Sequence, residues 1–237
     1  MVRLFVSSLA RKPEHRRARD SQHAPILERL ALKKLCWLPE DPRLKTVSDS
    51  SEAVKWIQGY EPDCSDQRAQ KNKILEACDG NPDILIRSFL PRHITASALV
   101  ISEDLSMVLL HHHAKLNRWL QFGGHCDGDG NLAYSALREC QEESGISDLW
   151  IFPRVIDVDI HVIPPIKEEP EHQHLDVRFI VFGNKTQKPC VSSESNEVRW
   201  FDIEKVDSLD TDGSVLRLVK KAQSFPWKKT MEQMGSV

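Results

Sequence analysis

Three glutamates, Glu139, Glu142 and Glu143, stand close together near the middle of this chain. Residues three and four apart share one face of an α-helix, so a helix here would bring the three carboxylates together. Like charges at that range repel each other unless a cation lies among them. Hard divalent ions prefer oxygen ligands, and Mg²⁺ is usually held by a few carboxylates together with substrate phosphates. For this spacing alone, a solvated acidic face of a helix is the more common explanation. The glycine turn before the segment and Arg138 beside the glutamates favour a Mg²⁺ site here.

A helix is expected at this place because the opposite face of the same segment is apolar. The apolar residues are Ala133, Ala136, Leu137 and Cys140. Asn131 is a suitable N-cap, and Gly145 suits the left-handed position that ends a helix. Arg138 precedes Glu142 by four residues, so its guanidinium can hold that carboxylate in place.

The segment from Gly124 to Ile146 resembles the Nudix box of the Nudix hydrolases, G-x5-E-x7-R-E-U-x-E-E-x-G-U, in which U is a bulky apolar residue. The positions that match are Gly124, Arg138, Glu139, Cys140, Glu142, Glu143, Gly145 and Ile146. One position departs from the pattern, because Gly130 stands where the first glutamate of the box belongs. Asp127 and Asp129 are nearby carboxylates that could replace it.

This resemblance implies an activity and a site. Nudix hydrolases cleave a diphosphate bond in a nucleoside diphosphate linked to another group, with Mg²⁺ or Mn²⁺ as the cofactor. By position, Glu139, Glu142 and Glu143 would bind the metal together with the backbone carbonyl of Gly124. Arg138 would orient a glutamate, and with the three carboxylates it completes the expected catalytic set. Which carboxylate accepts the proton of the attacking water is left open.

The resemblance also implies an α/β fold of the α+β type, the Nudix fold, with a mixed β-sheet sandwiched between helices. The flanking sequence agrees with this fold, since β-forming runs surround the box. The runs span residues 94–101, 107–110, 119–122, 155–163, 175–182 and 198–201. A closing helix is expected from Ser214 to Ala222.

Two of these runs carry a polar residue at every second position, which places the polar side chains of each run on one strand face. The first has Asp157, Asp159 and His161, and the second has His172, His174, Asp176 and Arg178. The connection between them is rich in turn-forming proline, so the two runs are expected to pair with coinciding polar faces.

Three interpretations of this polar face remain open. It could be a solvent-facing side of the sheet laced with ion pairs. It could recognise substrate through His161, His174 and Asp176, joined by His125, which follows the glycine pair closely enough for a phosphate contact. It could also form a second metal site on His161, His172 and His174 with an aspartate, a donor set that suits zinc or manganese.

Composition sets the outer bounds. The formal charge of −3 over 237 residues gives no clear nucleic-acid surface and no general attraction to anionic membranes. Apolar runs stay far below the roughly 18 residues of a membrane span. The six cysteines show no C-x-x-C pairing, and no secretory signal is visible, so a cytoplasmic protein with reduced thiols is expected.

Four segments are expected along the chain. Residues 1–20 form a basic, disordered tail, with an organelle transit peptide as the alternative. Residues 21–92 form a helical extension, residues 93–224 the Nudix hydrolase domain, and residues 225–237 a C-terminal tail. Helical patterns in the extension span residues 25–37, 51–60, 65–78 and 83–90. The extension would either shape a substrate pocket or form a homodimer interface.

The sequence thus predicts a metal-dependent hydrolase of the Nudix type acting on a small-molecule nucleotide. The alternative is a non-catalytic, Nudix-like module that binds a nucleotide and regulates another process. The complete set of Glu139, Glu142 and Glu143 favours catalysis. Gly130, in place of the first box glutamate, is the only feature that favours the binding module.

Overall fold

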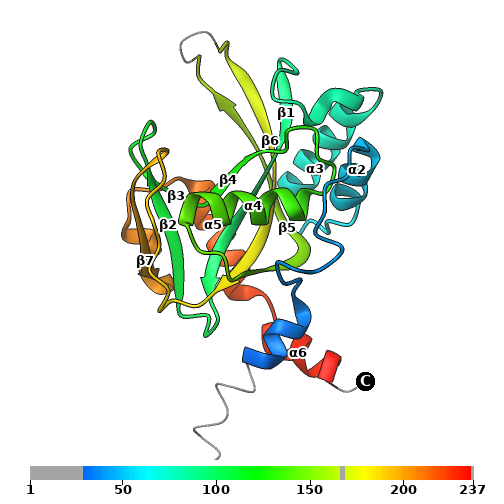
Figure 1. The fold of residues 1–237 in the computed structure, drawn as a ribbon. Helices are drawn as coiled ribbons and strands as arrows, with labels where there is room; N and C mark the ends of the chain where they lie inside the picture. The colour runs from blue at the N-terminus through cyan, green and yellow to red at the C-terminus, as the bar shows by residue number, and fades with distance from the viewer. Residues whose placement is uncertain (1–28, 166–168, 236–237) are drawn as a thin grey trace, which may run out of the picture.

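The computed structural model describes residues 29–165 and 169–235, so the expected basic tail of residues 1–20 lies outside the described residues. A seven-stranded sheet forms the centre of the molecule (Figure 1). Its strands are β1 (Arg92–Ser102), β2 (Met107–His113), β3 (Trp119–Leu120), β4 (Phe122–His125), β5 (Leu149–Ile163), β6 (His172–Gly183) and β7 (Ser195–Asp202).

The strands follow the order β3-β2-β1-β6-β5, with β4 paired to β1 and β7 paired to β2. The pair β1–β6 is parallel and the other pairs are antiparallel. The mixed sheet predicted from the sequence is therefore confirmed.

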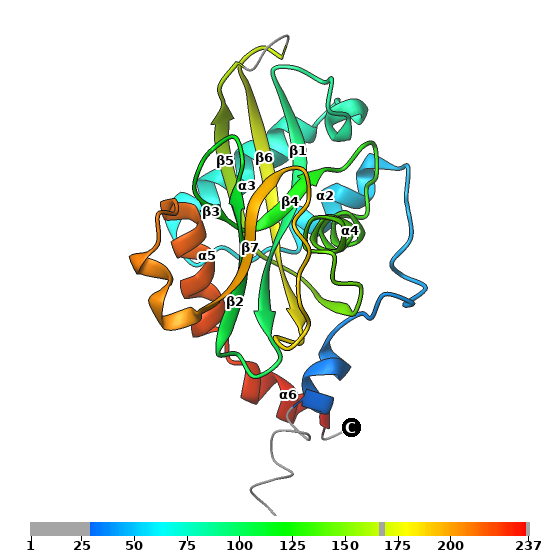
Figure 2. The same cartoon turned by 60° about the vertical axis from the view of Figure 1, so that its left-hand side comes forward.

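Helices cover both faces of the sheet, as Figure 2 shows with α4 and α5 on opposite sides of the strands. One face carries α4 (Leu132–Ser144), α2 (Ser50–Gln58) and α3 (Ser65–Cys78), and the other carries α5 (Gly213–Ser224). Coverage of both faces explains why nearly every residue of β1 is buried, because a strand between two helical layers has no solvent-facing side.

The N-terminal extension shares the hydrophobic core of the sheet. Ile57 of α2, Ile74 of α3 and Ile84 of the short 3₁₀ helix η1 (Pro82–Leu85) are buried in the same cluster as Ala136 of α4. Helix α3 has the bounds that the sequence predicts, whereas the helical pattern of residues 83–90 yields only the 3₁₀ turn. The 3₁₀ helix ends at Leu85 because the backbone of Ile86 is extended.

The C-terminal segment contains more structure than the tail expected for residues 225–237. After the 3₁₀ helix η2 (Ile203–Ser208) and α5, the helix α6 (Trp227–Gly235) lies beside the helical residues 29–35 (Figures 1 and 2). Trp227 is buried with Leu32 and Leu35 in one cluster, which joins the two ends of the described chain. Among the described residues, no helix is long and apolar enough to cross a membrane. The six cysteines carry free thiols.

Candidate active site

Helix α4 forms as the sequence predicts. The side chain of Asn131 accepts a hydrogen bond from the backbone N–H of Tyr134 at the N-terminus, and Gly145 closes the C-terminus in the left-handed conformation. Its buried face packs on β1 and β4, and Glu139 and Glu143 lie on the side that meets the glycines of β4. The helix therefore holds its carboxylates rigidly against the glycine-containing strand β4.

The glutamates of α4 gather beside Gly123 and Gly124. Glu143 is 6 % exposed and accepts a hydrogen bond of 3.1 Å from the backbone N–H of Gly123. A Cβ atom on Gly124 would lie 2.6 Å from Oε2 of Glu139, so a larger residue would displace that carboxylate. The side chain of Glu142 is 60 % exposed. Two of the carboxylates are thus largely buried and one is exposed.

Burial and mutual repulsion make the carboxylate cluster unfavourable by itself. The pKa of Glu139 is raised to about 7, mainly by burial and further by Glu142 and Glu194, against the lowering effect of Arg138. The pKa of Glu143 is raised to about 8, again mainly by burial, with Glu139 among the neighbouring charges. A divalent cation among these oxygens would offset both effects. The donor set therefore fits a hard metal ion.

Arg138 contacts the cluster from its own helix. Its guanidinium lies 3.0 Å from Oε1 of Glu139 and 3.5 Å from Oε2 of Glu142, and it donates a hydrogen bond of 2.9 Å to the backbone carbonyl of His125. These contacts link two glutamates to the loop that follows Gly124. The arrangement agrees with an orienting role for this arginine.

The loop between β4 and α4 is held by the N-terminal extension. The backbone N–H of Gly130 donates to the carbonyl of Val47 at 2.6 Å, and the N–H of Val47 donates to Oδ1 of Asp129 at 2.9 Å. The amide of Asn131 donates to the carbonyls of Arg43 and Lys45. We call residues 43–49 the strap. Asp129 thus binds the strap, a contact that no local sequence pattern predicts because it joins distant segments.

Two further acidic residues lie close enough to affect the glutamates. The charges of Asp127 and Glu194 both raise the pKa of Glu139. Asp127 is thus the better placed of the two aspartates that could stand in for the missing box glutamate. The charge of Glu194 acts on Glu143 as well, whereas Glu197 on the neighbouring strand β7 pairs with Arg199 at 3.4 Å.

A sequence model of the NUDIX domain matches residues 91–221, more than half of the chain. The chain belongs to the Nudix family. A comparison with curated proteins gave no match by sequence.

Solved structures of Nudix proteins are similar to this Nudix domain at low identity. The Ap4A hydrolase of C. elegans is 17 % identical, with 56 % of this chain and 96 % of that chain covered and a TM-score of 0.45. The NUDIX domain of Shewanella oneidensis NrtR, complexed with ADP ribose, is 15 % identical, with 72 % and 96 % covered and a TM-score of 0.45. A NUDIX-family hydrolase of Clostridium perfringens is 18 % identical, with 56 % and 98 % covered and a TM-score of 0.41. These likenesses indicate no substrate.

Beyond the box, the Nudix domain brings together the two polar strand faces predicted from the sequence. Strands β5 and β6 pair so that Asp157 stands opposite Arg178, Asp159 opposite Asp176, and His161 opposite His174. The ion pairs of this face are buried between the sheet and α5, and not solvent-facing as the first interpretation expected. Arg217 of α5 reaches both Asp157 and Asp159, at 2.9 and 2.7 Å.

Asp176 belongs to this buried network. One carboxylate oxygen accepts a hydrogen bond from Thr95, and the other accepts from Ser97 and from Nε of Arg178, the last two at 2.7 Å. Both oxygens are therefore engaged inside the sheet. We do not retain Asp176 as a substrate-binding residue.

The three histidines predicted to bind substrate lie at one end of the same polar face. The ring of His174 lies 5.3 Å from that of His125 and 5.4 Å from that of His161, measured between centroids. Burial lowers the pKa of His125 to about 4 and that of His174 to about 2, so both rings are neutral near pH 7. His93 was not among the predicted site residues, and its ring contacts those of His125 and His174. Its signal was the alternation His93, Thr95, Ser97 along β1.

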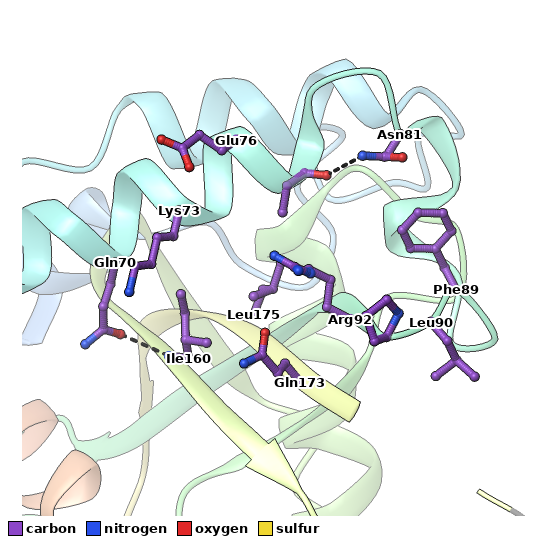
Figure 3. Close-up of a pocket in the computed structure, with 12 residues that line it drawn as sticks. Gln70, Lys73, Glu76, Asn81, Phe89, Leu90, Arg92, Ile160, Gln173 and Leu175 are labelled. Atoms are coloured by element: carbon purple, nitrogen blue, oxygen red, sulfur yellow. Dashed lines mark hydrogen bonds between the residues drawn. The ribbon is translucent and has the colours of Figure 1, made fainter. Parts of the chain in front are cut away.

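A separate cavity of about 660 Å³ lies on the other face of the sheet (Figure 3). Lys73 of α3, Arg92 of β1, Gln173 of β6 and Ile160 of β5 line it, and the last three alternate with the histidines along their strands. The extension thus shapes a cavity, although none of the box glutamates lines it.

Proposed function

We propose that this Nudix domain is a hydrolase that cleaves a diphosphate bond in a nucleoside diphosphate linked to another group. The proposed cofactor is Mg²⁺, with Mn²⁺ as a substitute. The observation that carries the proposal is the packing of Glu139 and Glu143 against the glycine pair of β4, beside Glu142 and Arg138. A module that only binds a nucleotide has no need for buried carboxylates whose repulsion must be offset.

In this proposal Glu139, Glu142 and Glu143 hold the metal together with the carbonyl of Gly124. When bound, the ion would neutralise phosphate charge and lower the pKa of a water molecule. Arg138 fixes the positions of two carboxylates through its contacts at 3.0 and 3.5 Å. Rigid placement of charged groups before substrate arrives is the main contribution of such a site to the rate.

Substrate contacts by His125, His161 and His174 stay a prediction. The side chain of His161 is 39 % exposed, and Asp159 orients its ring at 3.1 Å. It is therefore the histidine that we retain for contact with substrate. His125 and His174 are better explained by another role, argued below.

The test is product release from a panel of nucleotides in the presence of Mg²⁺. The panel contains ADP-ribose, dinucleoside polyphosphates, nucleotide sugars and nucleoside triphosphates. Replacing Glu142 or Glu139 by Gln should lower the rate by roughly 100-fold or more, as expected for loss of a carboxylate that acts in the reaction. Glu61→Gln, an exposed glutamate after α2, is the matched control and should keep the rate. Absence of any Mg²⁺-dependent product, or equal rates in wild type and Glu142→Gln, would favour the binding module.

A further inference from the structure

Five histidines from four strands converge beside the Nudix box. His93 of β1 pairs in register with His174 of β6, and His174 pairs with His161 of β5. His125 enters from β4, and His172 precedes His174 on the same strand face. The ring of His93 lies 5.1 Å from that of His125, 5.0 Å from that of His172 and 4.9 Å from that of His174. The sheet therefore concentrates imidazoles around His93.

His93 has no polar partner that would explain its burial. Its exposure is 1 %, and neither ring nitrogen has a hydrogen-bond partner among the described residues. Burial lowers the pKa of His93, and a weak hydrogen-bond-like contact with the backbone of Phe89 opposes this shift without reaching full hydrogen-bond geometry. Buried polar groups without a partner are rare and costly. A bound ligand at the ring nitrogens would account for the burial of His93.

The nitrogens of three rings lie close enough to share one ion. One nitrogen from each of His93, His125 and His174 lies within 4.8 Å of the others. A tetrahedral ion with metal–nitrogen bonds of about 2.0–2.1 Å needs its ligand atoms about 3.4 Å apart. Side-chain movements that shift the ring nitrogens by on the order of 1 Å would bring the three rings into that geometry.

His172 lies beside these three rings, outside the group whose nitrogens are all within 4.8 Å of one another, so a movement of its ring would be needed to supply a fourth ligand. Its Nδ1 lies 2.8 Å from the carbonyl of Pro170, and because a carbonyl only accepts, Nδ1 carries the proton. Nε2 is left with a free lone pair and lies 3.3 Å from Nε2 of His174, the spacing of two ligands on one tetrahedral ion. A backbone carbonyl that fixes the tautomer of a ligating histidine is a common feature of metal sites.

We propose that His93, His125 and His174, with Nε2 of His172, bind a transition-metal ion of the zinc class. Imidazole ligands suit Zn²⁺ and Co²⁺, whereas Mg²⁺ prefers oxygen, so this centre is distinct from the glutamate cluster. His125 directly follows Gly124, and the ion would therefore connect β1, β4 and β6 at the start of the box loop. Its role is structural support of that loop.

The proposal replaces the zinc site considered from the sequence, which used His161, His172 and His174 with an aspartate. In the structure Nδ1 of His161 contacts Asp159 at 3.1 Å, and His93 and His125 complete the group of rings instead. His161→Gln should therefore leave metal binding unchanged.

The experiment uses the full chain without a histidine tag, stripped of metal by a chelator and titrated with Zn²⁺ or Co²⁺. Wild type should bind one equivalent, show the visible absorption bands of tetrahedral Co²⁺, and gain on the order of 5 °C in Tm. His93→Gln and His174→Gln should abolish the bands, while His112→Gln, a histidine of β2 outside the group, should keep them. A wild type that binds no Zn²⁺, or variants of His93 and His174 that both still bind it, would overturn the proposal.

Two further variants separate this centre from the catalytic proposal. Glu139→Gln and Glu142→Gln should keep the Co²⁺ bands even where Mg²⁺-dependent hydrolysis is lost. Loss of the bands in these variants would place the ion at the glutamates and refute the histidine centre. Folding of each variant is checked by circular dichroism. If His93→Gln does not fold, His125→Gln takes its place in the metal titration.

Discussion

A Cβ atom on Gly130 would lie 2.2 Å from the backbone carbonyl oxygen of Asp49, far inside van der Waals contact. Asp49 ends the strap and caps α2, so this contact places the N-terminal extension directly on the box loop. The strap thus takes the space that a side chain at position 130 would need. A side chain at position 130, including the glutamate that the resemblance leads one to expect, would therefore require the strap to move.

We predict that Gly130→Glu does not improve the enzyme. The added side chain must displace the strap and break the hydrogen bond from Gly130 to Val47, so the free energy of unfolding should fall by about 1–3 kcal/mol, the usual cost of overpacking. Urea unfolding measures this loss. Gly213→Ala is the control, because a Cβ at that position meets open space. A Gly130→Glu variant as stable as wild type would contradict the steric explanation.

Arg138 is predicted to act by positioning the glutamates. Arg138→Ala removes its contacts with Glu139 and Glu142 but takes away no metal ligand. We expect kcat to fall by 10–100-fold, the range for residues that orient metal ligands, with KM for the nucleotide changed much less. Steady-state kinetics at several Mg²⁺ concentrations checks this, and excess Mg²⁺ should restore part of the rate. A variant with normal kcat and a raised KM would instead indicate that Arg138 binds substrate.

The buried ion network should dominate the stability of the sheet. Arg178 is 1 % exposed and contacts Asp157, Asp159 and Asp176 at 3.7, 3.3 and 2.7 Å. In Arg178→Met, only Arg217 and Lys221 would remain as positive partners of the three carboxylates. Breaking buried ion pairs in this way lowers the free energy of unfolding by about 3–5 kcal/mol. Chemical denaturation measures the loss.

The control for this prediction is Lys205→Met, which breaks a surface pair with Asp202 at 3.6 Å. Exposed pairs contribute about 1 kcal/mol or less, so this variant should resemble wild type. Equal stability losses in Arg178→Met and Lys205→Met would mean that the network adds little.

Sequence periodicity predicted the elements of this fold because each depends on local signals. Alternation identified β5 and β6, and the apolar stripe with its caps identified α4. The site was harder to predict where distant segments meet. The strap contact of Gly130 depends on how the N-terminal extension packs on the loop before α4. The position of His93 among the other histidines depends on the register of β1 against β4 and β6. No local pattern encodes either of them. Helix α6, which lies within the expected tail, has only nine residues. A helix of this length is marginal by itself, and the burial of Trp227 against Leu32 and Leu35 supports it.

The same network predicts how stability depends on pH. Burial would raise the pKa of Asp159, but the hydrogen bond with His161 and the charges of Arg178 and Arg217 outweigh it and hold that pKa well below its ordinary value. Asp157 and Asp176, the other carboxylates of the network, face the same cations. In the unfolded chain an aspartate has a pKa of about 3.9, so ionised Asp159 stabilises the fold fully above that pH. Its contribution is lost as the pH falls from about 4 toward the lower folded-state pKa.

Arg217→Met tests this dependence, because it removes the contact of 2.7 Å with Asp159 and lets the pKa of that carboxyl rise. The difference in unfolding free energy between wild type and Arg217→Met should be largest above pH 4 and should shrink at lower pH, as Asp159 becomes protonated in both proteins. Urea unfolding at a series of pH values measures the difference, with Lys205→Met again as the control. A difference that stays constant from neutral pH to pH 3 would show that Arg217 acts through packing and not through the charge of Asp159.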